Sequence, residues 1–196
     1  MPGRIRVDLF CEDAAHESWC RALLGRLADE ESIEVSIRGG TANLGIPRLK
    51  RELRAFSRIL EARAGLPDLL VVMIDANDVG PRARRQEIED AIDLGTFPAA
   101  VVGTPDPCVE RWFLADPESF SQRFRPVPSV PAGAPGEVWK DALIQALETA
   151  GEIVTGGGAE FAGDVMEGMS LYRGGRSDRT LKSFVDDLRA ALRRAL

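Results

Sequence analysis

Apolar and polar residues follow a repeating order along the first half of the chain. Four short runs have the apolar content of β-strands, and they cover 4–11, 33–38, 68–75 and 97–103. Between them, apolar residues recur at helical spacing over 15–29, 47–65 and 82–93. The run LLVVMI (69–74) is apolar throughout, which is typical of a central strand covered on both faces. The alternation predicts an α/β fold with a mostly parallel, four-stranded sheet flanked by helices.

The second half of the chain follows a different pattern. Asp106 and Pro107 have the residue types of a helix N-cap and first position, so we expect a helix over 108–116. The segment 125–136 contains four prolines and two glycines and is predicted to be a loop. Two more helices are expected, separated by a Gly-rich stretch, over 137–150 and 179–195. We therefore expect a core (1–124), a Pro-rich loop (125–136) and a helical C-terminal extension packed on the core (137–196).

Composition excludes several protein classes. The chain has 196 residues, 44% of them hydrophobic, and no apolar run approaches the roughly 20 residues that span a bilayer. Its beginning lacks the apolar core of a signal peptide, so we expect a cytoplasmic protein without a membrane partner. The three cysteines are scattered, which indicates free thiols, and one histidine cannot complete a zinc site with them.

The charge balance bears on nucleic-acid binding. A net charge of −6 gives no overall basic surface, so we expect the chain alone to bind DNA or RNA weakly. Basic residues cluster at 48–51, 82–85 and 189–194, and each cluster taken alone is explained as the solvated face of a helix.

Acidic residues follow three of the predicted strands. Glu12 follows the first, Asp75 ends the third, and Glu110 comes after the fourth. Because carboxyl ends of parallel strands meet at one edge of a sheet, we expect these carboxylates to lie close together. Oxygen ligands of this kind suit Mg²⁺ or Mn²⁺, and Asn77 and Asp78 offer two more. Each position also has an ordinary explanation: turn propensity at 75–80, helix capping at 12–13, and the helix dipole at Glu110.

The strand ends LFCE (9–12) and MIDANDVG (73–80) resemble motifs of the TOPRIM fold of topoisomerases, primases and nucleases. The chain resembles small TOPRIM-like proteins, and the RloB-like and OLD-type nucleases associated with phage defence, more than it resembles the topoisomerases. Further matches are Glu17, the segment PDPCVERWFLAD (105–116) with Glu110 and Trp112, and LKSFVDDLRAAL (181–192). The resemblance implies a TOPRIM-like (Rossmann-like) fold.

The same resemblance implies a Mg²⁺-dependent nuclease that hydrolyses phosphodiester bonds in DNA or RNA, with an ATPase as a partner. Glu12 would act as general acid or base and touch the metal, and Asp75 would be the principal ligand. Asn77 and Asp78 would support Asp75, and Glu110 would bind or orient a second ion. Two positions depart from the family pattern: Asn77 replaces an Asp, and Asp13 replaces a Gly. A catalytically inactive binding subunit therefore stays open as an alternative.

Other residues offer weaker alternatives. Glu12, Asp13, Asp75 and Thr104 could belong to a phosphoacceptor receiver domain, although the chain lacks that fold's fifth strand ending in Lys. Tyr172, the single tyrosine, has no sequence context for a topoisomerase nucleophile. His16 could contact a phosphate or serve as a solvated or capping residue. Cys108 could have a lowered pKa at a helix N-terminus, but no histidine is placed to activate it.

Overall fold

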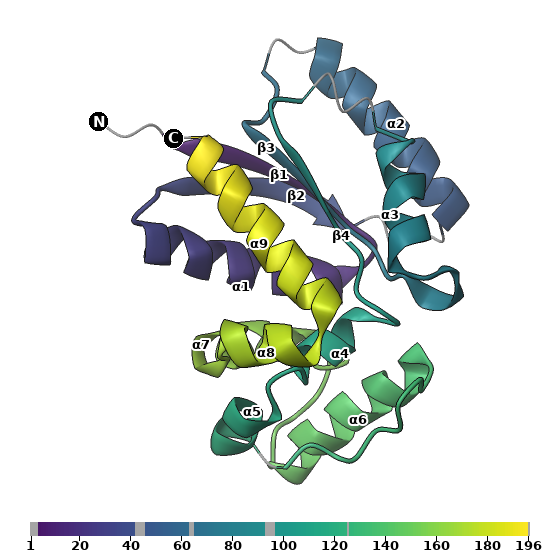
Figure 1. Cartoon of the computed structure of the whole chain (residues 1–196), viewed down its shortest axis with the longest axis vertical. Helices are drawn as coiled ribbons and strands as arrows, with labels where there is room; N and C mark the ends of the chain where they lie inside the picture. Colours follow the sequence, from purple (N-terminus) through teal and green to yellow (C-terminus); the bar gives the residue numbers. More distant parts are fainter. Residues whose placement is uncertain (1–3, 42–45, 63–64, 93–96, 125, 196) are drawn as a thin grey trace.

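The structure is a computed structural model that describes residues 4–41, 46–62, 65–92, 97–124 and 126–195. Within these ranges, the side chains of 40–41, 46–49, 60–61 and 78 are not described. The predicted α/β fold is confirmed: four strands form one sheet, all parallel, in the order β2-β1-β3-β4 (Figure 1). None of the described helices is both long and apolar enough to cross a bilayer.

The strands place their carboxyl ends at one edge of the sheet. They are β1 (Ile5–Cys11), β2 (Val35–Thr41), β3 (Leu69–Met73) and β4 (Ala100–Gly103). In register, Cys11 of β1 lies beside Met73 of β3, and Met73 lies beside Gly103 of β4. The residues that follow these strands therefore start from the same level of the sheet. Strand β3 is buried along its whole length, as the uninterrupted apolar run predicts.

Helices cover both faces of the sheet (Figure 1). On one face, α1 (Ala14–Glu31) and α9 (Arg179–Arg194) cover alternate strand residues such as Leu9 and Val71. On the other, α2 (Ile46–Ala62) and α3 (Pro81–Glu89) cover the opposite set, including Phe10 and Val72. This division follows from the two-residue period of side chains along a strand. The result is a three-layer arrangement with a separate apolar cluster on each face.

The chain after β4 forms helices that return to the sheet. They are α4 (Val109–Phe113), α5 (Pro117–Arg123), α6 (Gly136–Thr149), α7 (Ala162–Gly168) and α8 (Leu171–Ser177), followed by α9. Gly103 lets α9 approach β4, because a Cβ at this position would lie 2.8 Å from the Phe184 ring. On the same face, Trp112 of α4 stacks on Phe184, and its indole N–H donates to Thr180. Residues far apart in sequence thus share one core.

One detail of the predicted elements was wrong, and three short helices were not predicted. Asp106 does not cap a helix: Asp106–Pro107 is a cis peptide, and α4 begins at Val109 with Cys108 as its N-cap. The Gly-rich stretch before α9 contains the helices α7 and α8, and α5 was not predicted. These helices are seven residues long, so they are stabilised by packing rather than by their own propensity, which a sequence pattern cannot show.

Candidate metal centre

Glu12 and Asp75 meet at the carboxyl edge of the sheet, where β1 and β3 lie side by side. The backbone N–H of Glu12 donates to the Met73 carbonyl at 3.0 Å, which continues the strand pairing by one residue. The backbone N–H of Asp75 donates in turn to Oε2 of Glu12, also at 3.0 Å. Asp75 is 6% exposed and Glu12 is partly buried. The structure therefore brings together the two residues that the sequence placed at this edge.

His16 lies in the first turn of α1 and joins two of the acids. Its Nε2 is 2.8 Å from Oδ1 of Asp75, and its Nδ1 is 2.7 Å from Oδ1 of Asp13. Both ring nitrogens can donate to carboxylates only when the imidazole is protonated. Burial disfavours that charge, but the hydrogen bonds to Asp13 and Asp75 outweigh it and raise the pKa of His16 well above its usual value. The position of both ring nitrogens against carboxylates and the raised pKa thus favour the imidazolium form of His16, which is completely buried.

Asp13 caps α1, as the ordinary explanation for this position predicts. Its Oδ1 accepts the backbone N–H groups of Ala15 and His16 at 2.9 and 3.1 Å. Burial raises the pKa of Asp13, but the interactions with His16 lower it more, to about 2. The same carboxylate thus fixes the helix start and the orientation of the His16 ring. The suggestion that His16 is solvated was wrong.

Candidate ligand atoms of Glu12, His16 and Asp75 all lie within 4.8 Å of one another. Burial, the largest cause, raises the pKa of Glu12 in spite of the hydrogen bond from Asp75 N–H. As an imidazolium, His16 has no lone pair to offer an ion. A hard cation would therefore bind the oxygens of Glu12 and Asp75 that these hydrogen bonds leave unused, with His16 holding Asp75 in place.

Glu110 lies beside this group, in the first turn of α4. The backbone N–H of the preceding residue, Val109, donates to Oδ1 of Asp75 at 2.9 Å, so α4 begins against the site. Glu110 is 5% exposed, and its Oε2 is buried with no hydrogen-bond partner in the described part of the chain. Burial is the main cause that raises its pKa, and the charge of Asp75 adds to it. Glu110 is not a member of the compact group of Glu12, His16 and Asp75.

Lys140 is a site residue that the sequence did not indicate. It projects from α6, and burial, which lowers its pKa, is outweighed by the charge of Glu110, followed by that of Asp75, so its pKa is raised. No local pattern around Lys140 marks it, because α6 reaches the site only through its packing on α4. This lysine places an exposed positive charge opposite the acids.

The remaining predicted ligands, Asn77 and Asp78, and the motif residue Glu17 are placed differently. Asn77 is exposed, with a left-handed backbone (φ 46°), which is the conformation that favours Asn in turns. The side chain of Asp78 lies outside the described residues. Glu17 forms an ion pair with Arg21 at 2.7 Å along α1. For Asn77, turn chemistry is thus a sufficient explanation.

The Cys108 thiol does not have a lowered pKa. Burial is the largest cause and raises it, and the charge of Glu110 raises it further. Cys11, Cys20 and Cys108 are all free and buried, as the expectation of free thiols requires. A thiol nucleophile is thus disfavoured.

The donor set fits a hard divalent cation in its chemistry. It contains the carboxylates of Glu12 and Asp75, whose candidate ligand atoms lie within 4.8 Å of each other, and the buried Glu110 carboxylate, which has one unpartnered oxygen. Comparison of the chain with protein-family models, with curated proteins and with solved structures finds no match. The resemblance to TOPRIM-like proteins therefore rests on the sequence motifs alone.

Proposed function

We propose that the chain is a Mg²⁺-dependent, TOPRIM-like nuclease that hydrolyses phosphodiester bonds in DNA or RNA. One observation carries the proposal: Glu12 and Asp75 are joined by a hydrogen bond at the carboxyl edge of a parallel sheet, beside Glu110, whose buried Oε2 has no partner among the described residues. Parallel α/β sheets bind their ligands at this edge. Buried acids with raised pKa values, here Glu12 and Glu110, are also frequent in functional sites.

Glu12 and Asp75 would hold the ion, with Glu110 as a further ligand or as the holder of a second ion. When bound, Mg²⁺ supplies stabilisation of the negative charge that develops on the phosphate. Its charge would also replace the repulsion between these carboxylates by attraction. Mn²⁺ has the same preference for oxygen ligands and is expected to substitute for it.

The chain's own residues would divide the remaining work. Glu12 donates or accepts the proton of the attacking water or leaving oxygen, because its raised pKa brings it closer to neutral pH. His16 would keep Oδ1 of Asp75 occupied and so leave Oδ2 as the oxygen that could hold an ion. Lys140 attracts the phosphate, since it is the exposed cation that faces the acids from α6.

A groove next to the site offers contacts for the backbone of the substrate. It has a volume of about 230 Å³ and lies between α3 and α9, at the carboxyl end of β4. Thr104, which directly follows β4, lines it together with Arg82, Arg85 and Arg179. Arg85 is paired with Glu89 and Asp187, whereas Arg82 and Arg179 have no such pair within the described residues. These two arginines are the expected phosphate contacts.

The test is cleavage of plasmid DNA and of a structured RNA with Mg²⁺, Mn²⁺ or a chelator. Glu12→Gln and Asp75→Asn should each lower the rate at least a hundredfold, in line with the contribution of acid–base and metal groups, about 10²–10⁴-fold. Glu118→Gln is the matched control, because this exposed acid lies on α5, away from the sheet edge. Cleavage that persists in chelator, or in both site variants, would refute the proposal.

A catalytically inactive binding subunit is the second candidate, and His16 favours it. The imidazolium already supplies a positive charge to Asp75, so the site is partly compensated without an ion. Such a subunit would act through a partner, for which the resemblance suggests an ATPase. Absence of cleavage together with absence of Mg²⁺ binding by calorimetry would select this candidate.

A receiver domain is disfavoured by the surroundings of Asp75. The strand order β2-β1-β3-β4 matches the first four strands of the 2-1-3-4-5 order in receivers. However, Oδ1 of Asp75 already accepts from His16 and Val109, and the residue is buried. A small phosphodonor should therefore leave Asp75 unmodified, as measured by intact mass.

A further inference from the structure

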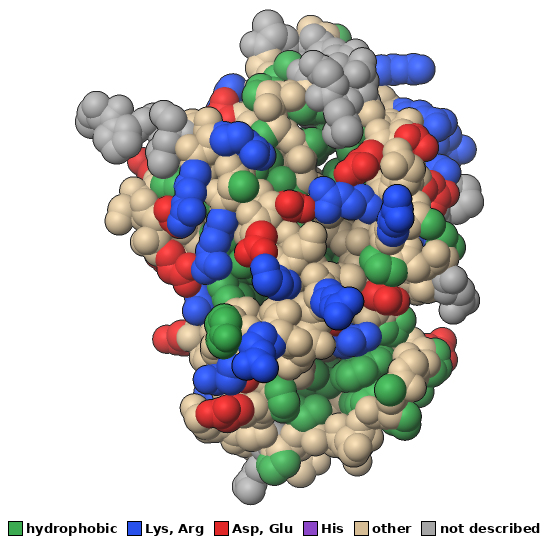
Figure 2. Space-filling view, viewed as in Figure 1, with side chains coloured by type: hydrophobic (Ala, Val, Ile, Leu, Met, Phe, Trp, Pro, Cys, Tyr) green, Lys and Arg blue, Asp and Glu red, His purple; other side chains and the backbone are tan. Residues whose placement is uncertain are grey.

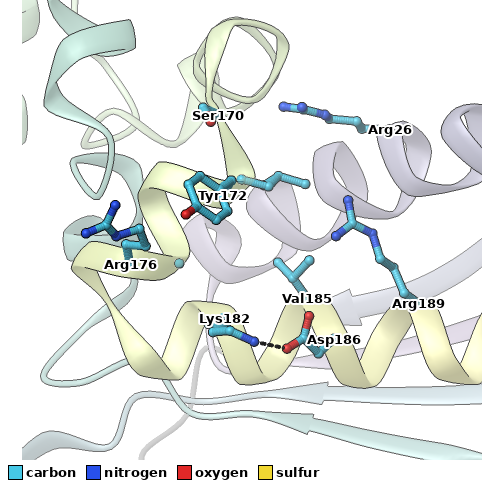
Figure 3. A pocket seen from close by; sticks show the side chains of 10 residues that line it. Arg26, Ser170, Tyr172, Arg176, Lys182, Val185, Asp186 and Arg189 are labelled. Atoms are coloured by element: carbon cyan, nitrogen blue, oxygen red, sulfur yellow. Dashed lines mark hydrogen bonds and ion pairs between the residues drawn. The ribbon is translucent and has the colours of Figure 1, made fainter.

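A second pocket lies away from the carboxylates, between α1, α8 and α9. Figure 3 shows Tyr172 and Arg176 on α8, Lys182 and Arg189 on α9, and Arg26 on α1 around one hollow. Its volume is about 410 Å³, which is within the range of small-molecule sites. We call it the cationic pocket.

The charge of the cationic pocket is opposite to that of the whole chain. Four of its lining residues are Lys or Arg, and Asp186 is its single acid, whereas the chain has 31 acidic and 25 basic residues. In Figure 2, Lys and Arg side chains gather over α8 and α9 in the same region. A site of this kind attracts anions, and phosphates in particular.

Tyr172 gives the pocket an aromatic surface. It is the chain's single tyrosine, and it is 72% exposed, whereas Trp112 and Phe184 on this side of the sheet are buried. The Arg176 guanidinium lies 6.0 Å from its ring centroid. A planar base can stack on such a ring while its phosphate reaches an arginine.

The cations of the pocket differ in how firmly they are held. Arg26 donates to the Met166 and Met169 carbonyls at 2.7 and 2.6 Å, so it forms part of the wall. Arg189 pairs with Glu30, and Lys182 with Asp186, through partly exposed carboxylates that solvent screens. Arg176 contacts the Tyr172 ring and has no carboxylate partner among the described residues. Arg176 is therefore the cation most available to a ligand.

We propose that the cationic pocket binds a phosphorylated nucleoside, with its base on Tyr172 and its phosphate on Arg176 and the α9 cations. The nucleotide is either free or one unit of a single strand, since both present the same base and phosphate. The site does not depend on the proposed cleavage activity, because it shares no residue with the carboxylate cluster or with the groove beside β4.

The experiment measures binding by calorimetry to the full chain, in chelator so that no cleavage occurs. The probes are adenosine diphosphate, inorganic pyrophosphate and a short oligothymidylate. Tyr172→Ala should weaken the binding of adenosine diphosphate at least fivefold, as expected from the loss of one stacked base. The same variant should leave the affinity for pyrophosphate unchanged. Tyr172→Phe should retain binding, because the ring persists. Arg176→Ala should weaken all three probes.

Arg54→Ala is the matched control, because this exposed arginine lies on α2, across the sheet. If adenosine diphosphate binds and the oligonucleotide does not, the ligand is a free nucleotide. If the oligonucleotide binds more tightly than adenosine diphosphate and is displaced by it, the ligand is a single strand. Failure of both probes to bind, or binding that Tyr172→Ala leaves unchanged, would overturn the proposal.

Discussion

The carboxylate site and the cationic pocket both concentrate charge, but they hold it in different ways. Around Asp75, the side chains of Glu12, Asp13, His16 and Asp75 are buried or partly buried and are fixed by hydrogen bonds of 2.7–3.1 Å. Around Tyr172, the charged side chains are exposed or half-buried, and solvent screens their ion pairs. Loss of one partner in the first region strands a buried charge, whereas in the second region water takes its place. Substitutions should therefore affect stability in the first region and ligand binding in the second.

The largest expected effect is that of His16→Gln. The substitution removes the cation between Asp13 and Asp75 and leaves the Asp75 carboxylate buried without its compensation. The free energy of unfolding, measured with urea at pH 6, should fall by about 3 kcal/mol. Arg54→Ala should change it little. A loss no larger than that of the control would contradict a buried imidazolium at this position.

The protonation of His16 should also be visible in the pH dependence of the free energy of unfolding. Because the pKa of His16 is raised in the folded chain, its contribution is complete below the unfolded value, about 6.5, and is lost as pH rises toward the folded value. In that window the stability difference between wild type and His16→Gln should shrink by about 1.4 kcal/mol per pH unit. The acidic groups that face the ring are Glu12, Asp13 and Asp75.

Asp13 has the opposite dependence. Its pKa is lowered to about 2, so its contribution is present above the unfolded value, about 3.8, and is lost as pH falls toward 2. Urea titrations between pH 2 and pH 9 would measure both the loss of stability toward low pH from Asp13 and the loss toward high pH from His16. If the difference in the free energy of unfolding between wild type and His16→Gln did not change between pH 6 and pH 9, the protonation of His16 would be contradicted.

Glu110→Gln should change the free energy of unfolding less than His16→Gln does, and the direction of the change should depend on whether Mg²⁺ is present. Without Mg²⁺ the variant should be more stable by about 1 kcal/mol, because a buried carboxylate with an unpartnered oxygen is costly. With Mg²⁺ the wild type should gain more than the variant, since Glu110 is proposed to bind the ion. Thermal midpoints with Mg²⁺ and with chelator would test this. Equal gains in both proteins would remove Glu110 from the metal site.

The smallest effect on stability is expected in the cationic pocket. Lys182→Ala removes an exposed ion pair with Asp186 and should change the free energy of unfolding by no more than about 0.5 kcal/mol. The same variant should weaken the binding of adenosine diphosphate. A loss of binding without a loss of stability separates a binding role from a structural one. A large loss of stability would show that the two regions do not differ as described.

Periodicity and residue type were sufficient for the fold and for part of the site. The apolar runs and helical spacings of residues 4–103 predicted a parallel sheet, because buried strands and amphipathic helices leave local patterns. Parallel strands in turn require that Glu12 and Asp75 share an edge, and the structure places them in contact. The capping role of Asp13 was also readable, since a helix start has a local signature.

The roles of His16, Lys140 and Tyr172 depended on the tertiary structure. The charge of His16 follows from two carboxylates that are 3 and 59 residues away in sequence, and only packing brings the distant one to its ring. Lys140 reaches the acids through the contact of α6 with α4, and the helices α7 and α8 exist because neighbouring elements cover them. Local patterns report the free energy of local structure, whereas pKa values, ion-pair partners and pockets depend on which distant groups share a low-dielectric space. The sequence thus determined the sheet and its acidic edge, and the tertiary structure decided which charges there are compensated.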